Sequence, residues 1–359
     1  MNASQHAMIQ DPIRRRLLAA AMAGSGLAGA SSVLAARPAP REGQRPFRIY
    51  AITFRGMTDV EKGFEEYFAS RKIPVQITYR DLNREAPRMK VFLEEIRATR
   101  PDLVYTWGTS VTLGVVGPYD GVQQGHHVTD IPVVFTLVAA PLQAKIVSDL
   151  SAPGRNVTGV THVVPTDAQI RAISAYRPFQ TLGVLYTSTE RNSVVTLEEI
   201  RRLGRERGFH TVERSFRLDA ERKPTADGAA DLVRELKDSG AQWLYLPPDS
   251  YLGTLAEGVI IPAAMELGLP TFASTEQLMQ AGALSGLVSR YYNVGQFTAH
   301  KAEQILVGKV APSTIPVEAL KRFSYQIRMS AAHRLKLPPP LPMLNYAEVI
   351  SGDSVGGGG

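Results

Sequence analysis

Polar side chains follow several short apolar runs of this sequence, at the positions where predicted strands end. Thr109 and Ser110 come after a run that ends at Trp107, and Thr136 directly follows Phe135. In parallel sheets, ligands bind outside the carboxyl ends of the strands, where helix N-termini offer free N–H groups. Each such residue alone is more often a helix cap, but their repetition predicts a polar ligand-binding cleft. Further residues occupy the same position: Asn192 and Ser193, Asp249 and Ser250, and Ser274 and Glu276.

Two charged residues are prominent at these strand ends. Asp249 has no evident capping task, because Ser250 could cap the following helix itself. Arg55 is a cation directly beyond the first predicted strand, where it is either a ligand contact or a solvated loop residue. We include both among the predicted ligand-binding residues.

No catalytic or metal-binding motif is present in the sequence. It lacks the patterns G-x-x-x-x-G-K-[ST], H-E-x-x-H and G-x-S-x-G, and it has no cysteine for thiol catalysis or iron–sulfur clusters. The pair His126 and His127 lies in a Gly/Gln-flanked loop, and adjacent histidines rarely reach one metal ion. A G-x-G-x-x-G match at 24–29 lies in the N-terminal leader, without the strand that gives this motif its meaning. We therefore expect no enzymatic activity, no catalytic residues, no metal and no cofactor.

Charge and length narrow the class of protein further. Lys plus Arg number 40 against 34 Asp plus Glu, and three of the basic residues form one triplet at 14–16. No dense basic stripe with interleaved aromatic residues is present, so the sequence does not predict nucleic-acid binding. A chain of 359 residues is about twice the usual domain size, which favours two lobes or domains.

Apolar runs alternate with helical patterns from residue 47 onward. Thr58 and Glu61 form a capping box, and apolar spacing at 229, 232, 233 and 236 predicts a helix that ends before Gly240. Continuous apolar strands separated by helices are typical of parallel sheets covered on both faces. The pattern predicts an α/β fold with two doubly wound, Rossmann-like lobes. The predicted strands are 48–54, 75–80, 103–107, 133–135, 182–186, 211–216, 243–246, 271–273 and 284–289.

The two ends of the chain lack this alternation of apolar runs and helical patterns. Residues 1–35 have the order of an export signal: a basic triplet, a stretch of small apolar residues and the small-residue exit Val33-Leu34-Ala35. The paired arginines resemble a twin-arginine signal, and both that route and the Sec route stay open. An uncleaved anchor helix is the alternative to export. The predicted division is signal 1–35, linker 36–46, lobe 1 at 47–157 plus 285–309, lobe 2 at 158–284 plus 310–337, and a disordered Pro/Gly-rich tail at 338–359.

Several segments resemble one family in order and spacing across residues 47–337. The sequence is similar to the ABC-transporter substrate-binding protein family that includes tryptophan and tyrosine binders. The segments that carry the likeness are IPVVFT at 131–136, PGRNVTGV at 153–160, LGVLY at 182–186 with Asn192-Ser193, WLYLPPD at 243–249, LPTFAS at 269–274, GAL at 282–284, Tyr291-Tyr292 and IPV at 315–317.

The resemblance implies a type I periplasmic-binding-protein fold, with three crossover segments and one ligand between two lobes. In the family's pattern, a ligand carboxylate would meet Thr109-Ser110 and Asn192-Ser193, and an ammonium group would meet Asp249. We expect Asp249 to be hydrated in an empty cleft. This sequence departs from the pattern at two places. Arg55 stands where the family more often has a neutral or acidic residue, and Ala139-Ala140 stand where it usually has an acidic residue before the proline. The ligand is thus an amino acid or a more acidic relative.

The resemblance also implies the protein's partners. We expect a periplasmic, monomeric receptor that delivers a small molecule to an ABC permease in the inner membrane. The alternative is a module that senses the ligand for a membrane histidine kinase or chemoreceptor, since the same fold and the same export signal serve both roles.

Export predicts that residues up to about Ala35 are absent from the mature protein. Intact-mass measurement of periplasmic material should show the shortened chain, because the signal is removed after translocation. Full-length mass in the membrane fraction would instead support the uncleaved anchor.

Overall fold

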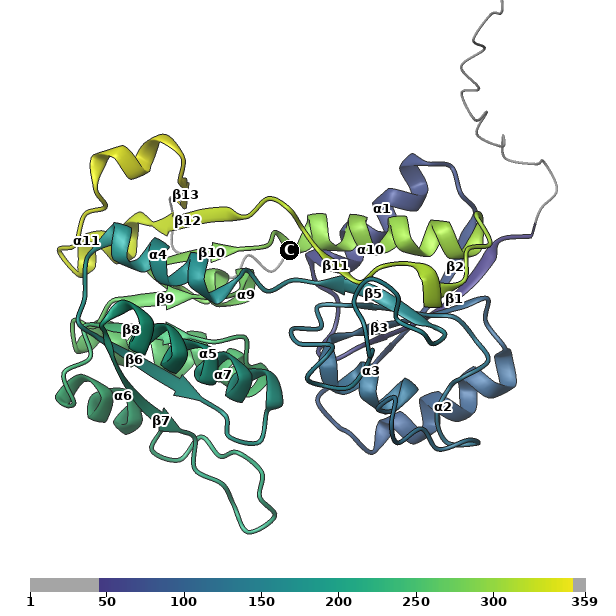
Figure 1. The fold of residues 1–359 in the computed structure, drawn as a ribbon, viewed down its shortest axis with the longest axis horizontal. Coiled ribbons are helices and arrows are strands. Elements are labelled where there is room, and N and C mark those ends of the chain that lie inside the picture. Colours follow the sequence, from purple (N-terminus) through teal and green to yellow (C-terminus); the bar gives the residue numbers. More distant parts are fainter. Residues whose placement is uncertain (1–44, 351–359) are drawn as a thin grey trace, which may run out of the picture. The chain divides into compact units, whose positions relative to one another are not determined.

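The structure is a computed structural model that describes residues 45–350, and the strands of this part form two sheets (Figure 1). The predicted export signal and the last residues of the predicted tail lie outside the described residues. Within residues 45–350, no helix combines the length and the apolar character needed to cross a bilayer.

The first sheet has six strands in the order β11-β5-β4-β3-β1-β2, and all neighbouring strands run parallel. This order places β1 and β3 side by side near the middle, so the residues that follow them lie at one edge of the sheet. The strands are β1 (Phe47–Thr53), β2 (Val75–Asp81), β3 (Leu103–Trp107), β4 (Val133–Thr136), β5 (Val157–Thr161) and β11 (Glu318–Ala319).

Helices cover both faces of the six-stranded sheet, because alternate residues of its strands point to opposite sides. Tyr50 and Ile52 of β1 pack with α2 (Arg88–Thr99) and α3 (Gly108–Val116). Ile49 and Ala51 pack on the other side with α1 (Asp59–Ser70) and α10 (Tyr291–Leu306), which lie next to one another in Figure 1. Both faces of β1 are therefore buried, as its continuous apolar sequence predicts.

The second sheet has seven strands in the order β13-β12-β10-β9-β8-β6-β7. In the described part of the chain, the β10–β12 pair of this sheet is antiparallel and its other strand pairs are parallel. The strands are β6 (Thr181–Tyr186), β7 (His210–Ser215), β8 (Trp243–Leu246), β9 (Thr271–Ala273), β10 (Ser285–Val288), β12 (Ser324–Arg328) and β13 (Glu348–Ile350).

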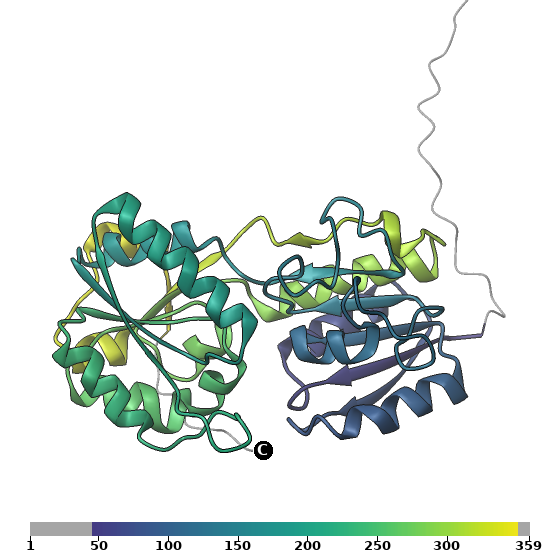
Figure 2. The same ribbon diagram turned by 60° about the horizontal axis from the view of Figure 1, so that its bottom comes forward.

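The seven-stranded sheet also lies between two layers of helices, which Figure 2 shows from a second direction. Trp243 and Tyr245 of β8 pack on one side with α4 (Thr166–Tyr176), α5 (Arg191–Arg207) and α11 (Met329–Arg334). Leu244 and Leu246 pack on the other side with a second group of helices. That group comprises α6 (Ala229–Asp238), α7 (Ser250–Leu255), the π-helix η1 (Ala256–Ile260), α8 (Ile261–Glu266) and α9 (Glu276–Gln280).

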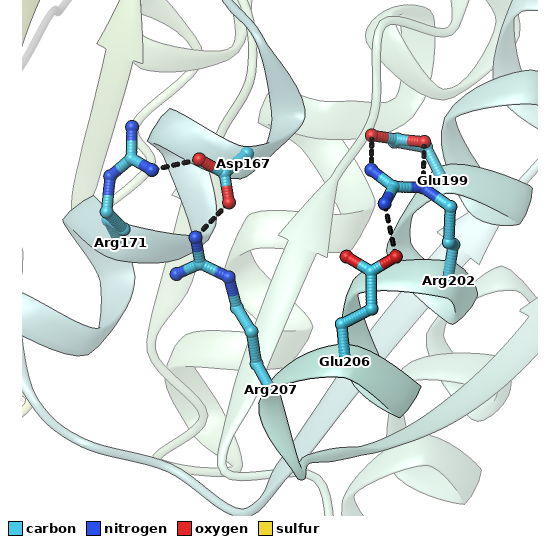
Figure 3. A network of polar contacts seen from close by, with 6 residues as sticks. All are labelled: Asp167, Arg171, Glu199, Arg202, Glu206 and Arg207. Atoms are coloured by element: carbon cyan, nitrogen blue, oxygen red, sulfur yellow. Dashed lines mark hydrogen bonds and ion pairs between the residues drawn. The ribbon is translucent and has the colours of Figure 1, made fainter.

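Two arginine clusters lie on the surface of α4 and α5 (Figure 3). Asp167 at the start of α4 accepts from Arg171 and from Arg207 at the end of α5, which joins the two helices. Arg202 pairs with Glu199 and with Glu206 within α5. Such exposed pairs stabilise the fold only slightly, about 0–1 kcal/mol each.

The chain passes between the two sheets three times. The first passage lies between β5 of the six-stranded sheet and α4, which packs on the seven-stranded sheet. The second lies between β10 of the seven-stranded sheet and α10, which packs on the six-stranded sheet. The third joins β11 of the six-stranded sheet to β12 of the seven-stranded sheet. The predicted lobe boundaries after 157, 284 and 309 each precede these passages. Apolar patterns mark a strand without indicating which sheet it joins, so the division of the chain into lobes remains a proposal.

The nine predicted strands each overlap a strand of the structure. Four were not predicted: β5, β11, β12 and β13. The expectation of a disordered tail from residue 338 was wrong for residues 338–350, which contain the 3-10 helix η3 (Leu341–Asn345) and β13. β13 has three residues and pairs with β12, so its own sequence is too short to indicate it.

Local signals set helix ends as the sequence predicts. Thr58 accepts a hydrogen bond from the backbone of Val60, and Glu61 accepts from the backbone N–H of Thr58, which completes the capping box of α1. Gly240 follows the end of α6 with φ at +89°, a conformation that glycine adopts without a Cβ penalty.

Two glycines let α1 and α10 approach closely. A Cβ at Gly295 would lie 1.9 Å from the carbonyl oxygen of Val60, and one at Gly63 would lie 2.1 Å from that of Tyr292. Backbone atoms cannot move aside as a flexible side chain can, so any larger residue must separate the helices.

We predict that Gly295→Ala lowers the free energy of unfolding by about 1–3 kcal/mol, because it overpacks this contact. Urea denaturation measures the change. Gly258→Ala is the control, since Gly258 is exposed in η1 and its Cβ would meet nothing within 4 Å. Equal stability of the two variants would contradict the prediction.

Candidate functional site

One cavity collects residues that follow strands of both sheets, and we call it the strand-end cavity. Arg55, Thr109 and Ser110 line it from the six-stranded sheet. Asn192, Asp249 and Ser250 line it from the seven-stranded sheet. The cavity measures about 50 Å³, which is room for roughly four water molecules. An acidic head group fits this space, whereas an aromatic ring needs more.

A wider hollow of about 690 Å³ adjoins the strand-end cavity. Ala139 and Asn192 line both spaces. The wall of this hollow includes Glu199 and Arg202, which pair with each other. A molecule with its head in the strand-end cavity can therefore extend into the wider hollow.

Four predicted site residues do not line the strand-end cavity. Thr136 is buried and accepts from Thr298 at 3.2 Å. The Ser274 carbonyl accepts from Gln169. Ser193 and Glu276 bind other residues, as the hydrogen bond from Ser193 to Asp249 and the ion pair of Glu276 with Arg290 show. Their role in ligand binding remains a prediction.

Asp249 is held by four hydrogen bonds from the chain itself. Its Oδ1 accepts from the Thr187 hydroxyl at 2.9 Å and from the Leu252 backbone N–H at 2.8 Å. Its Oδ2 accepts from the Thr187 backbone N–H at 2.7 Å and from the Ser193 hydroxyl at 2.6 Å. With 7% exposure, the carboxylate is not hydrated as the sequence led us to expect. Its four bonds use its full acceptor capacity. The bond from Leu252 caps α7, so the expectation that Asp249 has no capping task was wrong.

Glu190 supplies a second carboxylate to the start of α7. It accepts from the backbone N–H groups of Ser250 and Tyr251, each at 2.8 Å. Burial, and then the charge of Asp249, raises the pKa of Glu190 to about 7, and burial also raises the pKa of Asp249. The positive end of α7 is thus neutralised by the protein's own acids.

Arg55 lies at the opposite wall, where no acid pairs with it. Its guanidinium carbon is 4.9 Å from the centre of the Trp107 ring. No ion pair joins Arg55 to an acid anywhere in residues 45–350. Burial is the main cause that lowers its pKa, and the neighbouring Tyr291 partly opposes this shift. A cation taken partly out of water without a counter-ion is a candidate anion contact.

Several lining residues were missed by the sequence reasoning, among them the three largest ring side chains, Trp107, His162 and Tyr291. The others are Gly108, Leu137, Ala139, Pro248, Thr275 and Gln277. Trp107 is the last residue of β3, His162 follows β5 directly, and Tyr291 begins α10. The same position rule that identified Thr109 could have found Trp107, but its apolar type suggested core. The same rule could not identify His162, because β5, the strand that it follows, was not predicted. The ring centres of His162 and Tyr291 are 6.2 Å apart.

The polar groups that line this site suit the binding of a polar ligand. They are hydroxyls, two amides, an indole, an imidazole, a guanidinium and a carboxylate already in use. In the described part of the chain, no group of three or more His, Asp or Glu residues could hold a metal ion.

We predict that Asp249→Asn lowers the free energy of unfolding by about 1–3 kcal/mol. Either orientation of the amide places its NH2 against a backbone N–H, that of Thr187 or that of Leu252, which leaves a buried donor without a partner. Urea denaturation of the empty protein measures this loss. Asp238→Asn, at an exposed position, should cost nothing. A normal stability of Asp249→Asn would mean that the carboxylate is hydrated after all.

Known proteins similar to this chain have the same architecture. A conserved domain protein of Vibrio cholerae superposes with a TM-score of 0.74 at 21% identity, covering 86% of this chain and 100% of that one. The ABC domain from Streptococcus pneumoniae in complex with L-Trp gives 0.70 at 23% identity, covering 84% and 100%. A tyrosine-binding protein of Clostridioides difficile is 23% identical over 248 residues, which cover 68% of this chain and 66% of that protein, just under two thirds of its length.

The sequence profile of one family matches most of the chain. The family is described as ABC transporter substrate binding protein, and the match spans residues 57–349. The two sheets, their largely parallel strands and the three passages between them agree with this match. The chain therefore belongs to the ABC transporter substrate binding protein family and has the type I periplasmic-binding-protein fold.

Proposed function

We propose that this protein is an exported receptor that captures one small molecule, an amino acid or a related carboxylate, and delivers it to an ABC permease. The observation that carries the proposal is the strand-end cavity, where polar residues from both sheets meet at the carboxyl ends of their strands. The family match supports a binding role rather than catalysis. The basic triplet and small-residue exit of the leader support export to the periplasm.

The names of two relatives suggest where a ligand search should begin. One is a tyrosine-binding protein, and the other was crystallised with L-Trp. Cleft side chains decide the ligand, and the chains are under 25% identical, so the search must include other acids. We also propose that the receptor is a monomer.

We predict that a ligand at 100 times its dissociation constant stabilises the mature protein by about 2.7 kcal/mol. A thermal-shift screen against amino acids, mono- and dicarboxylates and small aromatic acids measures this effect. Ser110→Trp should abolish it, because Ser110 is exposed and lines the cavity, so an indole there fills the binding space without entering the core.

Ser70→Trp is the matched control, since Ser70 is exposed at the end of α1 and does not line the cavity. This variant should bind as the wild type does. Unchanged binding by Ser110→Trp would place the ligand elsewhere. A screen in which no small molecule stabilises the protein would contradict the proposed function.

A further inference from the structure

The strand-end cavity is lined by one cation, Arg55, and one carboxylate, Asp249, besides neutral donors and acceptors. Arg55 has no acidic partner within ion-pair distance among residues 45–350. Glu61 is the acid whose charge acts on it, and Glu61 already accepts from Thr58 and from the Tyr105 hydroxyl. Arg55 thus has Tyr291 as a side-chain hydrogen-bond partner but no carboxylate in an ion pair, so it can pair with an anionic ligand.

Two buried polar atoms of the same wall have no hydrogen-bond partner. They are Nε1 of Trp107 and Nδ1 of His162, whose residues are 8% and 7% exposed. Both residues line the cavity. An indole N–H only donates, and a neutral imidazole can donate from Nδ1. Burial lowers the pKa of His162 to about 4, so the ring is neutral at physiological pH. A buried donor without a partner is rare and points to a ligand.

The start of α3 adds free backbone donors to this wall. α3 has nine residues and begins at Gly108, and no side chain caps it. Thr109 and Ser110 in its first turn line the cavity. The start of α7 differs, because Asp249 and Glu190 already accept from its N–H groups. The start of α5 also has no capping side chain, and Asn192 in its first turn lines the cavity. The wall formed by the six-stranded sheet differs because it combines an uncapped helix start with a cation, Arg55.

The same comparison shows that the cavity has no free carboxylate for a ligand ammonium group, although Asn192 and Gln277, whose amides carry acceptor oxygens, line it. An ammonium group taken out of water needs a carboxylate or several acceptors around it. Asp249 is the one acidic residue that lines the cavity, and its two oxygens already accept four hydrogen bonds. A ligand ammonium would compete with those donors.

We infer, building on the proposed function, that the cavity selects a carboxylic acid that has no amino group. The ligand's carboxylate binds Arg55, the Trp107 N–H and the start of α3, and the rest of the molecule extends past Ala139 and Asn192 into the wider hollow. The positive charges of that hollow include Arg202, which Glu199 and Glu206 already neutralise (Figure 3). Arg205 also lines that hollow, and no ion pair joins it to an acid in residues 45–350. Arg55 is therefore the one cation of the strand-end cavity, and Arg205 is a second cation in the adjoining hollow.

The test uses two series of probes that differ only in their charged groups. The first is 3-(4-hydroxyphenyl)propionate, L-tyrosine and tyramine; the second is indole-3-propionate, L-tryptophan and tryptamine. Isothermal titration of the mature protein should show that each propionate binds at least about tenfold more tightly than its amino acid, because no carboxylate pairs with the ammonium. The two amines, which lack a carboxylate, should not bind.

Variants of Arg55 show whether this arginine receives the carboxylate. Arg55→Gln should weaken binding of the propionate by roughly 10- to 100-fold, since it removes a charge-assisted hydrogen bond. Arg55→Lys keeps the charge but loses the planar fork, so its loss should be smaller but measurable. Arg88→Gln is the matched control: Arg88 also lies over an aromatic ring, that of Phe92, but outside the cavity.

The outcomes separate this inference from the proposed function. Tighter binding of the amino acids than of the propionates, or equal effects of Arg55→Gln and Arg88→Gln, would overturn the inference and leave a solute receptor in place. Absence of binding by all six probes and by the whole screening panel would overturn both. If Arg55→Gln does not fold, Arg55→Lys carries the test, and unchanged affinity in it would overturn the inference.

Discussion

A buried carboxylate must be surrounded by donors, and the seven-stranded half of this protein depends on that requirement at Asp249. The donors come from three places: Thr187 after β6, Ser193 in α5, and Leu252 in α7. One side chain thus fixes the loops that follow β6 and β8, which are neighbouring strands. The loops that form the ligand wall on this side are held by the protein's own charge and need no ligand to arrange them.

The two walls of the strand-end cavity consequently differ in whether their positive groups already have acidic partners. At the seven-stranded sheet, Asp249 and Glu190 neutralise the positive end of α7. At the six-stranded sheet, the start of α3 has no capping side chain, and Arg55 has no acidic partner in the described chain. The fold offers similar helix ends on both sides. The difference in available charge comes from which acids the sequence places beside them.

The sequence allowed the fold class and much of the cavity to be predicted, because both follow from local patterns. Continuous apolar runs identify strands such as β3 and β8. The residues that follow the parallel strands lie at the carboxyl edge of each sheet, Thr109 and Ser110 at the six-stranded sheet and Asp249 at the seven-stranded sheet. Partners in space could not be predicted in this way. The donors to Asp249 lie up to 62 residues away in the sequence, so its burial was not visible. The strands β5 and β13 were also not predicted from the sequence, since short strands gain their stability from neighbouring strands.

Family membership and ligand identity rest on different residues, which is why one can be established without the other. The family match spans 57–349 and includes most strands and helices of the fold, whereas β1 and Arg55 lie before its first residue. A strand-end position is the same in every protein of this fold, but its side chain is free to change because it does not support the core. At such a position a single arginine over Trp107 changes the charge that the cavity can accept, while the backbone around it stays the same. We therefore propose that the ligand of this protein is decided by the charges at its strand ends, such as that of Arg55, rather than by its fold.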